Sequence, residues 1–132
     1  MSPSSTRQSE GDAAAAWSNC ELYRRGLELL NQGHYFDAHE ILEEVWRAAT
    51  GPERQFLQGL IQVAVALHHH STGNVEGASS VIGRAARNLA PYSDIFGNID
   101  LKALRAAVHH WQVALRQGRL PPVVKIVLAR QA

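Results

Sequence analysis

The feature that most constrains this chain is a stretch with almost no polar face, between residues 52 and 70. From residue 56 to residue 67 the only polar side chains are Gln58 and Gln62. The length of the stretch and its alanines favour a helix over a strand. A helix that is apolar on most sides has to be buried by its neighbours. The rest of the chain is therefore expected to surround a central helix.

Four further segments show helical patterns, and short breakers separate them. They cover residues 13–32, 35–49, 75–89 and 100–116. Asn74 and Asp100 stand where a helix N-cap is favoured. Because short connections make consecutive helices antiparallel neighbours, the sequence predicts an all-α fold, a compact antiparallel bundle of about five helices. In the first helix the residues expected to face inward are Trp17, Leu22, Leu27 and Leu30.

The predicted helical domain covers residues 13–118, and the two ends of the chain differ from it. Residues 1–12 contain almost nothing apolar and are expected to form a disordered leader. Residues 119–132 form a tail that is too apolar to stay in solvent, so it is expected to dock on the body or on a second subunit. This tail and the small residues of the 75–89 helix together predict a homodimer.

Composition and charge exclude several classes of protein. The 132 residues include one cysteine, which allows no intramolecular disulfide and suits a reducing, cytoplasmic location. No apolar run is long enough to span a membrane. Residues 1–76 carry ten acids and five bases, whereas residues 77–132 carry two acids and eight bases. These bases are dispersed, which argues against a nucleic-acid partner. The two halves are expected to attract each other within a subunit or between subunits.

One stripe of the 35–49 helix carries the candidate chemistry. At 100° per residue, His39, Glu43 and Trp46 share this stripe, and Tyr35 continues the apolar arc beyond Trp46. The opposite side of the helix is solvated and charged, through residues Asp37, Glu40, Glu44 and Arg47. A carboxylate that leaves water needs a partner.

The central helix offers partners at matching heights. Across an antiparallel turn near residue 51, Gln62 lies level with His39 and Gln58 lies level with Glu43. His39, Glu43, Gln58 and Gln62 are therefore expected to form a buried polar cluster. His68 is expected to line the same cavity from one end, with Trp46 as its wall.

The same residues carry a resemblance to a known family. The stretches Gly33–Glu40, Leu42–Trp46 and Phe56–Gln62, with Ala66-Leu67-His68, resemble the domain of unknown function 309, a family of small helical bacterial and archaeal proteins. Its hallmark is His-x3-Glu-x2-Trp, met here by His39, Glu43 and Trp46. The similarity extends over about residues 22–104. It implies an all-helical fold and a metal-binding role for the motif, and it supplies no reaction.

The pocket has two interpretations. An imidazole and a carboxylate at i and i+4 can bind one divalent metal ion, with the third ligand from His68, Gln62 or water. Alternatively, His39 and Glu43 belong to a polar cluster that only fixes helix register. Were the pair catalytic, metal-assisted hydrolysis would be the reaction class, but no residue is assigned as catalytic. An alternative function comes from residues 27–42, which are similar to one tetratricopeptide hairpin and would form a protein-interaction module.

Overall fold

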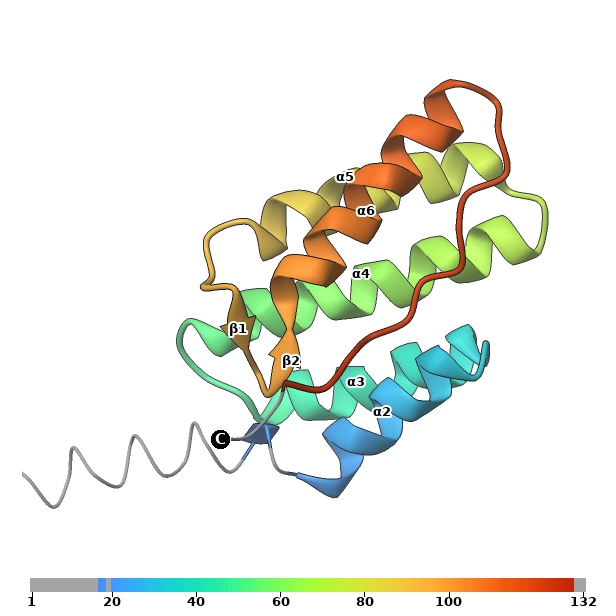
Figure 1. Cartoon of the computed structure of the whole chain (residues 1–132). Helices are drawn as coiled ribbons and strands as arrows, with labels where there is room; N and C mark the ends of the chain where they lie inside the picture. The colour runs from blue at the N-terminus through green and yellow to red at the C-terminus, as the bar shows by residue number, and fades with distance from the viewer. Residues whose placement is uncertain (1–16, 19, 130–132) are drawn as a thin grey trace, which may run out of the picture.

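The computed structural model describes residues 17–18 and 20–129, and five helices lie within them (Figure 1). The helices are α2 (Glu21–Asn31), α3 (Tyr35–Ala48), α4 (Glu53–Ser71), α5 (Val75–Leu89) and α6 (Leu101–Arg116). The predicted all-α class is confirmed. The predicted leader, residues 1–12, lies outside the described residues.

The apolar helix α4 occupies the middle of the bundle. It packs against α3 on one side and α5 on the other, while α2 pairs with α3 and α6 pairs with α5 (Figure 1). Nine of its residues are buried: Phe56, Leu57, Gly59, Leu60, Ile61, Val63, Ala64, Ala66 and Leu67. Of the described helices, none combines the length and the apolar character needed to cross a membrane.

The two predicted N-caps are confirmed. The Asn74 Oδ1 atom accepts a hydrogen bond of 2.9 Å from the Gly77 N–H at the start of α5. Asp100 Oδ1 accepts one of 3.0 Å from the Ala103 N–H at the start of α6. Both bonds satisfy a backbone donor that has no partner within its own helix.

A short hairpin lies between α5 and α6, in one of the breakers that separate the predicted helices. Strands β1 (Ile95–Phe96) and β2 (Ile99–Asp100) pair antiparallel, with Phe96 opposite Ile99. The connecting residues Gly97 and Asn98 both have φ of +60°, as a tight two-residue hairpin turn requires. The Tyr23 hydroxyl donates a 2.6 Å hydrogen bond to the Gly97 carbonyl, which ties the hairpin to α2.

That contact also explains one wrong prediction. Leu22, expected to face inward, is 40% exposed, whereas Tyr23 beside it is buried. The rotation of α2 is set by Tyr23, which reaches the hairpin, and by Leu27 and Leu30, which are buried as predicted.

The tail runs back from the end of α6 to the hairpin (Figure 1). Trp111 Nε1 donates a 2.7 Å hydrogen bond to the Pro122 carbonyl, and the side chains of Val124 and Ile126 are buried. Asn31 at the end of α2 binds the backbone of Ile126 twice, accepting from its N–H at 2.7 Å and donating to its carbonyl at 2.8 Å. The described part of the tail therefore lies against α2, α6 and β2 of its own chain.

Candidate functional site

A hydrogen bond within α3 fixes the imidazole of His39. Its Nδ1 atom lies 2.8 Å from the Phe36 carbonyl oxygen. A carbonyl only accepts, so Nδ1 carries the hydrogen and donates it. The other ring nitrogen, Nε2, faces the carboxylate of Glu43, with 3.6 Å between Nε2 and Oε1. In the neutral imidazole, a nitrogen lone pair therefore points at a carboxylate oxygen.

The carboxylate of Glu43 lies between two basic side chains of its own helix. While Oε1 faces His39, Oε2 lies 3.6 Å from Arg47 Nη2. The side chains of His39 and Glu43 are 20% and 39% exposed. The pair is thus half-buried, not enclosed as the sequence predicts, and water reaches the carboxylate.

A hollow of about 220 Å³ opens beside Glu43, between α3 and α4. Its lining residues are Glu43, Trp46, Arg47, Gln58 and Ile61. The structure thus places Trp46 and Gln58 next to the carboxylate. The guanidinium of Arg54 stacks on the Trp46 ring at 3.8 Å from its centroid, an interaction that the sequence pattern does not reveal because Arg54 comes from α4.

Gln62 does not join this group. Its Oε1 accepts a 2.7 Å hydrogen bond from Asn88 Nδ2 on α5. The Asn88 Oδ1 in turn lies 3.5 Å from Gln55 Nε2. The expected cluster of four is therefore split, because Gln62 is turned towards α5. The prediction from matching heights did not consider a competing amide on α5, Asn88.

His68 reaches the site through an aromatic ring. The Phe36 ring lies 5.0 Å from the His39 ring and 5.5 Å from the His68 ring, measured between centroids. Phe36 is 51% exposed, and it is not among the site residues that the sequence predicts. Tyr35 is half-buried and packs against the core. Within residues 17–18 and 20–129, no three His, Cys, Asp or Glu side chains are close enough together to hold a metal ion.

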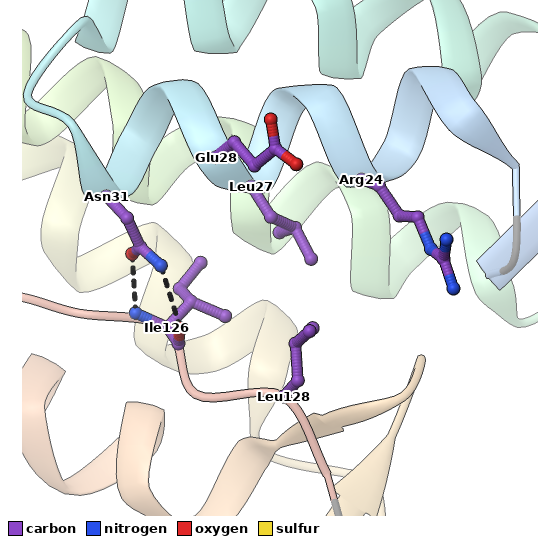
Figure 2. Close-up of a pocket in the computed structure, with 6 residues that line it drawn as sticks. All are labelled: Arg24, Leu27, Glu28, Asn31, Ile126 and Leu128. Carbon is purple, nitrogen blue, oxygen red and sulfur yellow. Dashed lines mark hydrogen bonds between the residues drawn. The ribbon is translucent and has the colours of Figure 1, made fainter.

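A second hollow, of about 320 Å³, lies between α2 and the tail (Figure 2). Its lining residues are Arg24, Leu27, Glu28, Asn31, Ile126 and Leu128. The sequence offered a signal for it, because an apolar tail needs a place to dock, but it did not indicate which helix would receive the tail.

Comparison with known proteins identifies the segment that carries the His39–Glu43 pair. Residues 23–81 match the model of the domain of unknown function DUF309. This segment is a DUF309 domain. The resemblance inferred from the sequence is thereby confirmed, although the match ends within α5 and the expected similarity extended to residue 104. His39, Glu43 and Trp46 all lie inside the DUF309 segment, whereas the tail lies outside it.

Two relatives match parts of this chain. An uncharacterised protein of Aquifex aeolicus is 37% identical over 87 residues, which cover 65% of this chain and 26% of that protein. The uncharacterised protein YpuF of Bacillus subtilis is 43% identical over 56 residues, which cover 42% of this chain and 32% of YpuF. The matches thus span about a quarter to a third of the length of these relatives.

Proposed function

We propose that His39 and Glu43 form a two-ligand site for a divalent metal ion, with its remaining positions filled by water or by a ligand from outside the chain. One observation carries this proposal: the Nδ1–H bond to the Phe36 carbonyl directs Nε2 at the Glu43 carboxylate. Metal-binding histidines typically donate their other ring N–H to a carbonyl or carboxylate in this way.

The distance supports the same proposal. A tetrahedral metal with bonds of roughly 2.0–2.1 Å holds two donors about 3.3 Å apart, and the His39 Nε2 and Glu43 Oε1 atoms are 3.6 Å apart. An imidazole nitrogen and a carboxylate oxygen suit borderline metals such as Zn²⁺. A cation between them also removes the repulsion between the lone pair and the carboxylate.

Two features limit the affinity. Arg47 already neutralises part of the charge on Glu43, and His68 packs against Phe36 instead of completing a third ligand. A site with two protein ligands and open positions suits exchangeable metal, and its half-exposed carboxylate leaves room for an incoming ligand. The tetratricopeptide-like alternative is not favoured, because the α2–α3 hairpin packs through α3 on α4 as part of one bundle.

The test is calorimetric titration of Zn²⁺ into protein that carries no histidine tag. We expect one saturable site, and His39→Ala and Glu43→Gln are each expected to weaken binding by about tenfold or more, since even second-shell losses cost 10–100-fold. The matched control is His109→Ala, an exposed histidine on α6, which leaves the affinity unchanged. A wild type that binds no Zn²⁺, or a His39→Ala variant that binds it equally well, contradicts the proposal.

A further inference from the structure

The last described part of the tail, residues 126–129, is paired with β2 along one side only. Ile99 and Leu128 form an antiparallel bridge. The hydrogen bonds on either side of this bridge are made by Val127 and Ala129, both at 2.8 Å, and Leu128 makes neither of them. In this ladder pattern the N–H and the carbonyl of Leu128 point away from β2. They therefore face α2, across the hollow that separates this helix from the tail.

The side chain of Asn31 shows what this side of the tail can bind. Its amide accepts from the Ile126 N–H at 2.7 Å and donates to the Ile126 carbonyl at 2.8 Å. Ile126 and Leu128 are two residues apart in an extended segment, so their N–H and carbonyl groups point to the same side. Within residues 17–18 and 20–129, no hydrogen bond occupies these groups of Leu128. Leu128 thus offers the donor and the acceptor that an amide already fills at Ile126.

The space in front of Leu128 is large enough for a small ligand. The hollow between α2 and the tail has a volume of about 320 Å³ (Figure 2), and small-molecule sites span about 300–1,000 Å³. A neighbouring hollow of about 220 Å³ shares Arg24, Leu27 and Leu128 with it and reaches Ala129. We call these two hollows together the α2–tail groove. Leu27 and Ile126 give the groove apolar walls.

Arg24 gives one end of the groove a positive charge. Among the described residues its guanidinium makes no ion pair, whereas Glu28, the other charged side chain of the groove, lies 3.5 Å from Arg25. Figure 2 shows Asn31 and Arg24 at opposite ends of the first hollow, with Leu128 between them. A ligand that pairs with Leu128 therefore meets Arg24 if its negative charge lies at the end away from Asn31.

We propose that the α2–tail groove binds the C-terminal end of a peptide whose last residue is apolar. The peptide adds to the free side of the tail as a short strand, parallel to the tail. In this orientation a backbone carbonyl of the peptide accepts from the Leu128 N–H, and the N–H of its last residue donates to the Leu128 carbonyl. The terminal carboxylate then lies at the Arg24 end, where a guanidinium forms a charge-assisted hydrogen bond with it. The last side chain lies among the apolar walls, beside Leu27.

Titration of the full chain with N-acetyl-glycyl-leucine, followed by ¹H–¹⁵N NMR, tests this proposal. We expect saturable shifts of the Leu27 and Leu128 amide resonances, with a dissociation constant on the order of 1 mM, because few groups take part. Two altered peptides probe the contacts. The C-terminal amide lacks the negative charge, and the N-methylated leucine analogue lacks the N–H that Leu128 accepts. Each is expected to bind at least about fivefold more weakly.

Two variants test the same contacts from the protein. Arg24→Gln is expected to weaken binding of the acid about tenfold, as loss of a charged hydrogen bond does, and to leave binding of the C-terminal amide unchanged. Leu128→Pro removes the N–H that faces the groove but neither ladder bond to β2, and it is expected to weaken binding of both peptides. The matched control is Arg84→Gln, which removes an exposed positive charge on α5 and leaves both affinities unchanged. Circular dichroism verifies that each variant is folded.

Four results would each overturn the proposal. The first is a wild type that shows no saturable shift up to about 10 mM peptide, and the second is equal affinity for the acid and the C-terminal amide. The others are an Arg24→Gln variant or a folded Leu128→Pro variant that binds the acid as tightly as wild type does. Arg24 and Leu128 lie outside the hollow beside Glu43, and the titration contains no metal. None of these outcomes therefore depends on the binding of Zn²⁺.

Discussion

Gly97 combines a left-handed backbone with a crowded Cβ position. Its φ is +60°, and an added Cβ would lie 2.7 Å from both the Phe56 ring and the Tyr23 hydroxyl oxygen. We expect Gly97→Ala to lower the free energy of unfolding by about 2–4 kcal/mol, through left-handed strain and overpacking. Gly118→Ala is the control, because Gly118 has φ of +66° and open space around it. Gly118→Ala is therefore expected to lower the free energy of unfolding only by the cost of the left-handed backbone, about 1–2 kcal/mol. Urea unfolding measures both, and equal losses would contradict the packing argument.

Tyr23 makes the free energy of unfolding depend on pH in the alkaline range. Burial raises the pKa of its phenol well above the ordinary value, so the folded state keeps the neutral form. Above pH about 10 the phenol of the unfolded chain ionises while the buried one does not, and stability falls as pH rises. Below that pH the group contributes no pH dependence.

Replacing Tyr23 by phenylalanine separates these effects. Tyr23→Phe loses the hydrogen bond to Gly97, which costs about 1 kcal/mol at neutral pH, but it reduces the loss of stability between pH 10 and 11 that the raised pKa causes. Burial also raises the pKa of Tyr92, so the Tyr23→Phe variant is still expected to lose some stability at alkaline pH. Urea unfolding from pH 7 to 11 checks this. A variant with the same alkaline slope as wild type would contradict the assignment to Tyr23.

The α4–α5 pair depends on a close approach at Gly59. A Cβ there would lie 2.6 Å from Leu89 Cδ2, in the fully buried core. We expect Gly59→Ala to destabilise by about 1–3 kcal/mol. Gly83→Ala on α5 meets only the flexible end of Arg87 at 3.9 Å, so it is expected to stabilise by about 0.5–1 kcal/mol. Thermal unfolding distinguishes them, and a neutral Gly59→Ala would contradict the close packing.

Helices were the most predictable elements, since their signals are local. Asn74 and Asp100 cap their helices where the pattern places them, and α5 begins and ends at the expected residues. The β1–β2 hairpin was missed because each strand has two residues, too few for a periodic pattern, and because its anchor, Tyr23, is distant in sequence.

The sequence predicts which side chains of the candidate site lie together on one helix better than it predicts contacts between helices. Periodicity along α3 placed His39 beside Glu43, and matching heights placed Gln58 near them. The Gln62 side chain is directed by its hydrogen bond with Asn88. The His68 ring packs against the Phe36 ring. Neither effect follows from a single helical pattern, because each depends on side chains of another element.

At the scale of the molecule, the acidic half (residues 1–76) and the basic half (residues 77–132) are not joined by ion pairs among the described residues. The Arg105–Asp94 pair lies wholly in the basic half, and the other ion pairs of the described residues lie within α2 or α3. Attraction between the halves in one subunit therefore does not act through contacts in this part of the chain.

Binding of a metal ion between His39 Nε2 and Glu43 is tested most directly by long-range ¹H–¹⁵N NMR of the histidine side chains. We expect the His39 proton on Nδ1, where it is donated to the Phe36 carbonyl, and a shift of the Nε2 resonance on addition of Zn²⁺ that Glu43→Gln reduces. A His39 protonated on Nε2 alone, or an Nε2 resonance that does not respond to Zn²⁺, would contradict it.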